Sequence, residues 1–378
     1  MKTRAWALVA AIVFTVSACS GGTAQSPAAS ATAAPASEAP SAAAASPSAA
    51  TAERPEIVWL EQNAGTPYWD AQHMAAAEAG ERLGFDFRAV SGNGDPASQA
   101  ATLQQLADQG VNTIMLNAIN PAATEPAVTY AKDKGANVVN LYGIDPNATA
   151  SVTFDEVRVG EIAARYALTL LEERNGSPTG KIAVLTGIQG QPASDERAKG
   201  FTDFMAQQDG VEVVAEQPTN WSADEASATM QNWLVAYPDL SMVYALSDTL
   251  AVPAMNVAER SDRLCTQDSN WEANPSCIIF VAVDGIFVNE VVDGRLYATQ
   301  LYSPEWSGFL FADVAYKVAS GADFPTETKA DALLVTPENA ECVAAMQAEM
   351  TNDLADFPFE GTLAEIAEGK GCTVVSVE

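Results

Sequence analysis

From Glu56 onward, short apolar runs alternate with amphipathic stretches, and this alternation restricts the folds that the chain can adopt. The helices expected in the first half are residues 69–83, 97–109 and 122–134, and the last two end at Gly110 and Gly135, as helices closed by a glycine do. The strands expected around them are residues 57–60, 85–90, 113–116 and 137–141. Strand and helix in alternation at this spacing predict βαβ units on a parallel sheet.

The same pattern begins again in the second half, after a link at residues 151–155 and a long helix at residues 156–173. Two similar halves predict an α/β fold of two doubly wound, Rossmann-like domains with a ligand in the cleft between them. The strands expected in the second half are 182–185, 211–214, 242–245 and 278–283, and the helices are 194–208, 223–236 and 250–259.

The residues after Ser303 complete the βα pattern of the first half. We therefore expect the chain to cross between the domains near Phe154, near Tyr302 and again before Ala332, which makes a three-segment hinge. The boundaries that follow are 55–153 plus 303–331 for the N-terminal lobe and 154–302 plus 332–378 for the C-terminal lobe.

The N-terminus has the pattern of an export signal. A basic start leads into an apolar run that ends in Val16-Ser17-Ala18, immediately before Cys19. This resembles a bacterial lipobox, so residues 1–18 are predicted to be a lipoprotein signal peptide and Cys19 to carry the lipid. The alternative is an ordinary cleaved signal with an incidental cysteine.

Residues 19–54 consist almost entirely of Ser, Ala, Pro, Thr and Gly. Such a stretch buries too little apolar surface to offset its ordering entropy, so we expect a disordered tether. A lipid and a tether together predict a folded part outside the cytoplasm, anchored to the outer face of the cytoplasmic membrane or in a periplasm. We expect this lipid anchor to be the protein's only contact with the membrane.

The formal net charge of −30 argues against two classes of partner. An acidic surface repels nucleic acid and anionic lipid head groups. It also argues against an anionic ligand reached by long-range steering. The simplest interpretation is a solvated acidic coat that keeps an exported domain soluble.

Apart from the one predicted to carry lipid, the cysteines fall into two local pairs. In an exported chain this predicts the disulfides Cys265–Cys277 and Cys342–Cys372. A metal site is not expected, because there is no C-x-x-C motif and His73 is the only histidine. No cofactor is expected either, since the chain has neither a Walker loop nor a G-x-G-x-x-G fingerprint.

Polar and aromatic residues gather where the predicted strands end, and open α/β sheets bind ligands at that edge. Nearly every predicted unit supplies such a residue. The positions are Thr66-Pro67-Tyr68-Trp69, Asn117, Tyr142, residues 189–197, Trp221, Ser247-Asp248 and Asp284-Gly285.

Several of these segments match a known family pattern. Thr186-Gly187-Ile188-Gln189-Gly190 followed by Arg197-Ala198-Lys199-Gly200-Phe201 is similar to a G-x-x-G…R-x-x-G-F segment, and Val281-Ala282-Val283-Asp284-Gly285 is similar to a strand that ends in Asp-Gly. Thr66-Pro67-Tyr68-Trp69 stands where the family often has Asn-Pro-Phe-Phe. In these segments the chain resembles the type I periplasmic binding proteins, in particular the ribose-binding-like group that serves sugar ABC importers. The resemblance covers roughly residues 56–336.

The resemblance implies a role for each matching residue. Aromatic rings of Tyr68, Trp69 and Trp221 would line the apolar faces of a sugar, while Arg197 and Asp284 would bind its hydroxyl groups. The full set of candidate ligand-binding residues is Thr66, Tyr68, Trp69, Asn117, Tyr142, Arg197, Trp221, Ser247, Asp284 and Tyr302. The implied partners are a small sugar or polyol and an ABC permease, with the chain itself a monomer.

The clearest departure from the family is Leu141-Tyr142-Gly143, where many pentose binders have Leu-Asp-Arg. Ser247 and Tyr302 also stand where ribose binders more often have Asn and Gln. The loss of that Asp and Arg suggests a ligand other than ribose, such as a different polyol, sugar or sugar-like molecule.

Each assignment has a structural alternative. Tyr68 and Trp69 could be core aromatics, Asp284-Gly285 plain turn chemistry, and Ser247-Asp248 the N-cap of a helix. The Arg197 guanidinium could pair with Asp195 or Glu196 on its own helix. His73 is expected to face solvent or a neighbouring side chain on the first helix.

Other functions remain open on the sequence. A binding protein for a furanose signal, a nucleoside or an amino acid would have the same fold, as would a sensor or scaffold lipoprotein without an importer. An extracellular carbohydrate-active hydrolase is less favoured, because a Ser-His-Asp arrangement would have to use His73 and no G-x-S-x-G motif is present. We therefore expect a binding protein rather than an enzyme.

Overall fold

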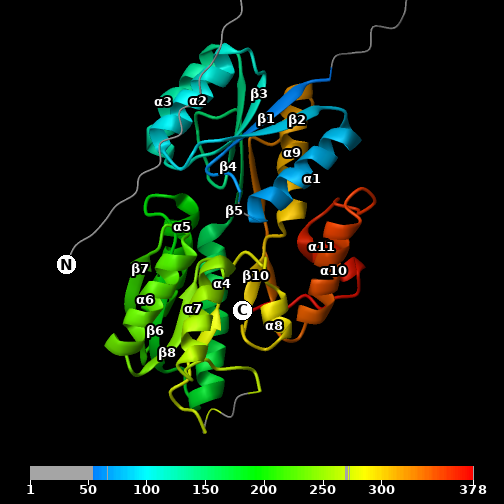
Figure 1. Ribbon diagram of the computed structural model, residues 1–378. Helices are drawn as coiled ribbons and strands as arrows, with labels where there is room; N and C mark the ends of the chain where they lie inside the picture. The colour runs from blue at the N-terminus through cyan, green and yellow to red at the C-terminus, as the bar shows by residue number, and fades with distance from the viewer. Residues whose placement is uncertain (1–53, 66, 269–270, 272, 378) are drawn as a thin grey trace, which may run out of the picture. The chain divides into compact units, whose positions relative to one another are not determined.

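The computed structural model describes residues 54–65, 67–268, 271 and 273–377 (Figure 1). The predicted signal peptide, Cys19 and the tether up to residue 53 lie outside the described residues, as does Thr66. Among the residues that are described, no helix is both long and apolar enough to span a membrane.

The first lobe is built on a six-stranded parallel sheet in the order β11-β5-β4-β3-β1-β2. Helices α1 and α9 cover one face and α2 and α3 the other (Figure 1). Its strands are β1 (Glu56–Glu61), β2 (Asp86–Ser91), β3 (Thr113–Asn117), β4 (Asn137–Leu141), β5 (Ala150–Phe154) and β11 (Glu327–Ala330), and its helices are α1 (Pro67–Leu83), α2 (Pro96–Asp108), α3 (Pro121–Asp133) and α9 (Pro304–Ser320).

The second lobe is built on a four-stranded parallel sheet in the order β7-β6-β8-β9. Helices α4 and α5 pack together, and so do α6 and α7. The strands are β6 (Gly180–Thr186), β7 (Val211–Pro218), β8 (Leu240–Ala245) and β9 (Ile279–Val281), and the helices are α4 (Glu156–Asn175), α5 (Pro192–Met205), α6 (Ala223–Ala236), α7 (Asp248–Arg260) and α8 (Asn289–Val292).

Helices α4 and α5 approach each other closely because glycine lies at their contact. A Cβ at Gly160 would come within 2.1 Å of the Arg197 carbonyl oxygen, so only glycine fits there. This contact brings the first turn of α4 beside the Arg197 side chain.

The chain passes between the two sheets at three places, after Phe154, at Tyr302 and between β11 and β12 (Leu333–Val335). Strand β10 (Thr299–Leu301) pairs antiparallel with β12 and is bridged to the second sheet. Two of the crossing segments are in contact, since the rings of Phe154 and Tyr302 stack with centroids 3.8 Å apart.

The C-terminal segment after β12 contacts both lobes. It contains α10 (Ala340–Asn352) and α11 (Leu363–Gly369), drawn in orange and red in Figure 1. In the first lobe, Arg82 donates to the carbonyl oxygens of Leu354 and Phe357. In the second lobe, Gln347 donates to the Gly285 carbonyl oxygen at 3.1 Å. This segment therefore bridges the lobes beside the hinge.

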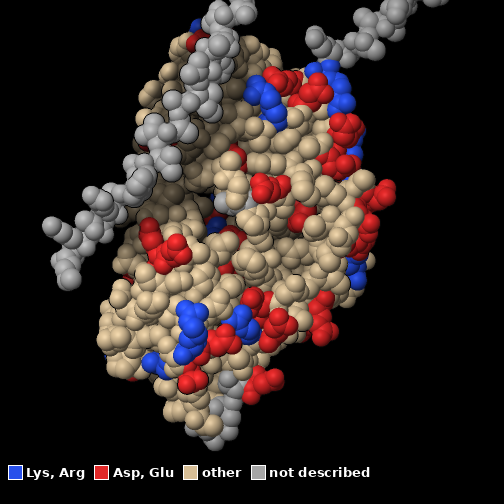
Figure 2. Space-filling model, viewed as in Figure 1, with Lys and Arg blue, Asp and Glu red and all other residues tan. Residues whose placement is uncertain are grey.

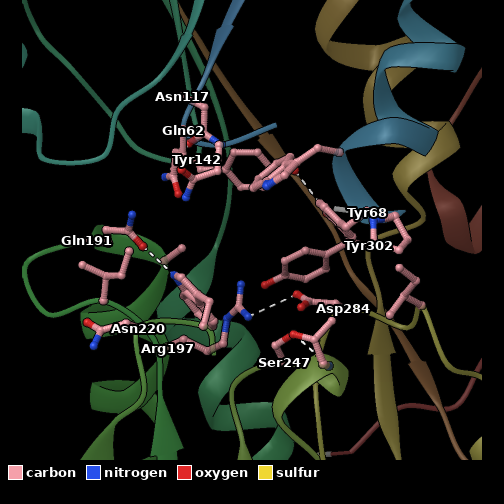
Figure 3. A pocket seen from close by; sticks show the side chains of 18 of the residues that line it. Gln62, Tyr68, Asn117, Tyr142, Gln191, Arg197, Asn220, Ser247, Asp284 and Tyr302 are labelled. Atoms are coloured by element: carbon pink, nitrogen blue, oxygen red, sulfur yellow. Dashed lines mark hydrogen bonds and ion pairs between the residues drawn. The ribbon is translucent and has the colours of Figure 1, made fainter. Parts of the chain in front are cut away.

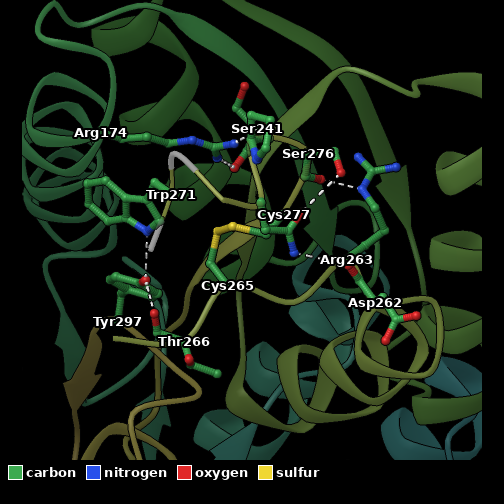
Figure 4. The surroundings of a disulfide bond; sticks show 12 residues. Arg174, Ser241, Asp262, Arg263, Cys265, Thr266, Trp271, Ser276, Cys277 and Tyr297 are labelled. Carbon is green, nitrogen blue, oxygen red and sulfur yellow. Dashed lines mark hydrogen bonds between the residues drawn. A yellow bond between two sulfur atoms is a disulfide. The ribbon is translucent and has the colours of Figure 1, made fainter. Parts of the chain in front are cut away.

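Both predicted disulfides are present, Cys265–Cys277 and Cys342–Cys372. Figure 4 shows the first, which closes a loop beside β9. Trp271 of this loop donates from its indole N–H to the Tyr297 hydroxyl at 3.2 Å. The second disulfide joins α10 to the chain after α11.

The predicted fold class is confirmed, with one error in its elements. Residues 151–155 were predicted to be a link, but Ala150–Phe154 form β5, which lies between β4 and β11. The strand is short, and one of its two partners comes from residues 327–330, so nothing in the local pattern identifies it. The domain boundaries themselves stay a prediction.

His73 was predicted to face solvent or a neighbour on its own helix, which is wrong. Its Nε2 lies 3.2 Å from Oε2 of Glu61 on β1, and its ring packs edge-on against Trp59. Burial lowers the pKa of His73. Burial and the nearby Asp70 carboxylate raise the pKa of Glu61 to about 7. The buried Glu61 and the partly buried His73 thus bind protons differently in the folded and unfolded states.

This pair predicts how stability changes with pH. The pKa of Glu61 is higher in the folded state, so its contribution is full below the unfolded value of 4.5 and is lost as the pH rises through about 7. The thermal midpoint of the parent protein should therefore rise as the pH is lowered from 8 to 6.5. The same change of pH should raise the thermal midpoint of Glu61→Gln by less. Calorimetric melting of both proteins at several pH values measures the difference.

The control is Glu56→Gln, which changes a half-exposed carboxylate at the start of the same strand. This variant should keep the parent's rise. Equal pH slopes in the parent and in Glu61→Gln would contradict the assignment of the titration to Glu61. Below the ordinary His pKa near 6.5, the lowered pKa of His73 works against stability, so measurements above pH 6.5 separate Glu61 from His73. Burial also raises the pKa of Asp248 to about 7, so the contribution of Glu61 is the difference in pH slope between the parent and Glu61→Gln.

Candidate functional site

A cavity of about 500 Å³ lies between the two lobes and is lined by side chains from both. Figure 2 shows the surface hollowed there, and Figure 3 shows the side chains around the cavity. The candidate residues that line it are Tyr68, Trp69, Asn117, Tyr142, Arg197, Trp221, Ser247, Asp284 and Tyr302. The lining also includes Gln62, Asn63, Ile188, Gln191, Asn220, Thr249, Val252, Ile286 and Phe287.

Aromatic rings from the first lobe form one wall. Tyr68 and Trp69 lie in the first turn of α1, and Tyr142 follows β4 with a φ of 59°. The rings of Trp69 and Tyr142 meet edge to face with centroids 5.6 Å apart. The hydroxyls of Tyr68 and Tyr142 lie 3.1 Å apart, and Gln72 donates to the Tyr142 hydroxyl at 2.5 Å. Tyr142 is therefore held in place by hydrogen bonds as well as by packing.

Asn117 ends β3 and is 2% exposed. Gln62 donates from its Nε2 to the Asn117 Oδ1 at 3.1 Å. The Asn117 Nδ2 has no hydrogen-bond partner within the part of the chain that the structure describes. The hydrogen bond from Gln62 thus fixes the orientation of the Asn117 amide, and the N–H groups of that amide are left unpaired.

Trp221 forms the opposite wall, from a loop in a rare conformation. Asn220 and Trp221 both have positive φ, 51° and 58°. A Cβ at Gly187 would lie 2.0 Å from the indole ring, so the ring can occupy this position only because residue 187 is glycine. The Trp221 indole N–H donates to Oε1 of Gln191 at 2.7 Å. Asn adopts positive φ comparatively readily, but this backbone conformation is unfavourable for Trp, so surrounding contacts must hold Trp221 in place.

The charged end of the cavity is centred on Arg197, which is 3% exposed. Its Nε and Nη2 donate to the two carboxylate oxygens of Glu156 at 2.8 and 3.1 Å. Its Nη1 donates to the Leu246 carbonyl oxygen and to Asp284 Oδ1, the latter at 3.3 Å. The Tyr302 hydroxyl donates to Glu156 at 2.5 Å, and the Tyr302 ring lies beside the guanidinium.

These contacts use four of the guanidinium's five N–H groups. Glu156 was not predicted. Its signal in the sequence is an acidic residue at the start of the helix that follows the first crossing, but only the fold brings it to Arg197.

Burial shapes the protonation of this group. Burial raises the pKa of Asp284 and of Glu156, and Arg197 opposes the rise in each case. Burial by itself would lower the pKa of Arg197, but the neighbouring Glu156, Tyr302 and Asp284 together raise it, so the guanidinium stays charged. Of the two carboxyl groups paired with Arg197, only Asp284 lines the cavity, so its oxygens are the acceptors that a ligand's hydroxyl groups can reach.

Ser247 caps α7, as the structural alternative proposed. Its Oγ accepts from the Thr249 backbone N–H at 3.1 Å and contacts the Thr249 hydroxyl at 2.7 Å. Asp248, next in the chain, accepts from the Thr299 hydroxyl and the Phe287 backbone N–H. Ser247 also lines the cavity, so its two predicted roles are compatible.

The structure decides the alternative for Arg197, which pairs with Glu156 and Asp284 and not with its helix neighbours. Asp195 instead accepts from the Gly190 backbone N–H.

All candidate ligand residues that are described lie around one cavity, while their binding roles stay predictions. The prediction missed Gln62, which follows β1 directly. Gln191 lies within the segment 189–197 that was predicted to follow a strand, but it was not named as a candidate ligand residue. In the described ranges, no three His, Cys, Asp or Glu side chains are placed to hold a metal ion.

The family model and the relatives that match this chain are all binding proteins. A family model described as periplasmic binding protein domain matches residues 57–323. The ribose import binding protein of Escherichia coli is 26% identical over 281 residues, which cover 72% of this chain and 89% of that protein. The xylitol-binding protein of Mycolicibacterium smegmatis is 26% identical over 256 residues, which cover 66% of this chain and 68% of the relative.

The solved structures show the same architecture. An ABC transporter solute-binding protein from Mycobacterium smegmatis with bound glycerol has a TM-score of 0.68 and 27% identity, and the match covers 76% of this chain and 96% of that one. A fructose-binding periplasmic domain of a hybrid two-component system has a TM-score of 0.70 at 21% identity, and the match covers 84% of this chain and 99% of that one. With a family model that covers most of its length, the chain belongs to the periplasmic binding protein domain family.

Proposed function

We propose that this protein is an extracytoplasmic solute-binding protein that captures a sugar or sugar-like polyol between its lobes and delivers it to an ABC importer. The observation that carries the proposal is the cavity between the lobes, where aromatic rings face the buried Arg197 and the partly buried Asp284. The role is binding rather than catalysis.

The chemistry of the lining suits a polyhydroxylated ligand. Sugar rings and polyols present C–H groups that pack on aromatic faces, here those of Trp69, Tyr142 and Trp221. Their hydroxyl groups both donate and accept hydrogen bonds, and a buried polar group left unpaired costs about 1–3 kcal/mol. Asp284 offers acceptor oxygens and Arg197 an N–H, so adjacent hydroxyls can be bound in a defined order.

Tyr142 favours a ligand other than ribose. It occupies the position where many pentose binders have Asp, and its hydroxyl is already engaged with Gln72 and Tyr68. A carboxylate, which can only accept hydrogen bonds when ionised, is thus replaced by an aromatic side chain. The named ligands of the relatives, ribose and xylitol, and the glycerol bound in a solved structure support the broader class of sugars and polyols.

The hinge supplies the mechanism. The lobes are linked by the crossings at Phe154, at Tyr302 and before β12, and such crossings allow one lobe to rotate against the other. A ligand that touches both lobes stabilises the closed state by its differential affinity for closed over open. Closure would bury the ligand and form the surface that a permease recognises.

The binding prediction concerns Trp221 and Asp284. A thermal-shift screen over D-ribose, xylitol, D-allose, D-fructose, glycerol and myo-inositol should identify at least one ligand of the parent. Trp221→Ala removes a stacking face and Asp284→Ala removes a partly buried acceptor. Each should therefore weaken binding of that ligand by about 2 kcal/mol or more, roughly 30-fold, in calorimetric titration.

Matched controls are Trp271→Ala in the Cys265–Cys277 loop and Asp239→Ala on the surface, neither of which lines the cavity. Both should bind as the parent does. If the two cavity variants kept the parent's affinity and folded normally, the ligand would bind elsewhere.

The anchor prediction concerns Cys19. The basic start, the apolar run and the order Val-Ser-Ala-Cys support lipidation of Cys19, with residues 19–54 as the tether. Expressed in a bacterial host, the parent should fractionate with membranes and incorporate labelled fatty acid, whereas Cys19→Ser should do neither. Membrane association of the Cys19→Ser variant at the parent's level would disprove the lipid anchor.

A further inference from the structure

Gln191 has a feature that the proposed function has not yet used. It lies between β6 and α5, lines the cavity and is 3% exposed. Its Oε1 accepts the Trp221 indole N–H, while its Nε2 has no hydrogen-bond partner among the described residues. A buried amide nitrogen without a partner is uncommon in a folded protein, so it calls for an explanation.

The orientation of the amide is fixed by its neighbour. An indole N–H can only donate, so the amide oxygen must face Trp221 and the nitrogen must point away from it. Trp221 cannot easily move, because its ring lies on Gly187 and its loop has positive φ at two successive residues. Figure 3 shows the Gln191 amide at the edge of the cavity, with the dashed bond to the indole on its oxygen side.

The same arrangement occurs in the other lobe. The Asn117 oxygen accepts from Gln62, and its nitrogen is unpaired at the cavity wall. Each lobe therefore presents one amide whose oxygen is engaged within the protein and whose N–H groups are left for something else. A ligand that offers acceptor oxygens to both lobes would satisfy both amides.

We infer that Gln191 is a ligand-binding residue that donates a hydrogen bond from Nε2 to an acceptor oxygen of the sugar or polyol. The inference rests on the proposed function and adds a specificity-determining residue to it. Trp221 and Gln191 would then bind neighbouring parts of the ligand. The Trp221 ring packs on a C–H face of the sugar or polyol, and the Gln191 amide donates to an oxygen beside that face. A ligand that lacks this oxygen would leave the Gln191 N–H groups buried and unpaired.

The decisive variant is Gln191→Glu, because its carboxylate can still accept the Trp221 N–H but cannot donate to a ligand. Gln191→Met is the second variant; it is similar in size and carries no charge, so it tests the lost donor without a new buried anion. The control is Gln189→Glu, two residues earlier, which is exposed and does not line the cavity. Affinities are measured by calorimetric titration with D-ribose, D-allose, D-glucose and xylitol, and with 2-deoxy-D-ribose and 2-deoxy-D-glucose.

Both Gln191 variants should bind the parent's best ligand at least tenfold more weakly, and Gln189→Glu should bind it as the parent does. Melting temperatures close to the parent's would show that the loss is not due to unfolding. The set of analogues that bind should also change. Discrimination is the ratio of the Kd of a deoxy sugar to the Kd of the sugar that keeps the oxygen. For at least one such pair, this ratio should be at least fivefold smaller in both Gln191 variants than in the parent. A merely structural Gln191 would weaken all ligands alike and leave this ratio unchanged.

Two results would overturn the inference in different ways. If the parent binds a sugar or polyol and both Gln191 variants bind it equally well, or lose affinity with every discrimination ratio unchanged, Gln191 is not a ligand-binding residue while the proposed function stands. If the folded parent binds no sugar or polyol tested, the proposed function fails and this inference fails with it.

Discussion

The buried Arg197 guanidinium connects the parts of the molecule on which the site depends. It contacts Glu156 at the first crossing between lobes, the Leu246 carbonyl after β8 and Asp284 after β9. Tyr302 at the second crossing joins the same group through Glu156. A buried charge must be paired and hydrogen-bonded, so this one side chain fixes two hinge segments and the ligand-facing loop of the second lobe together.

Around this charged centre, several residues that line the cavity have unfavourable backbone conformations. Tyr142, Trp221 and Asp284 all have positive φ and all face the cavity. Such conformations cost free energy and persist where surrounding contacts hold them, which is common at binding sites. Here the contacts are the Gln72 hydrogen bond to Tyr142, the Gly187 surface under Trp221 and the Gln347 hydrogen bond to Gly285.

The last of these contacts links the site to the segment after β12, which lies beyond the residues matched by the family model. Gln347 of α10 holds the loop next to Asp284, while Leu354 and Phe357, farther along the segment, accept from Arg82 of the first lobe. Because the segment touches both lobes, opening of the hinge must either carry it with one lobe or break contacts to the other. The Cys342–Cys372 disulfide ties the segment to itself.

The sequence by itself determined the two repeated βα halves, both disulfide pairs and the set of residues at the strand ends, because hydrophobic period, cysteine spacing and turn residues are local signals. The tertiary structure alone decided what those residues contact. Strand β5 needs β11 from far along the chain, Glu156 reaches Arg197 only because Gly160 lets two helices meet, and the Gln191 amide is oriented by Trp221 thirty residues away. Hydrogen bonds and ion pairs between distant segments depend on side-chain geometry in the folded state, which no local pattern of residues encodes.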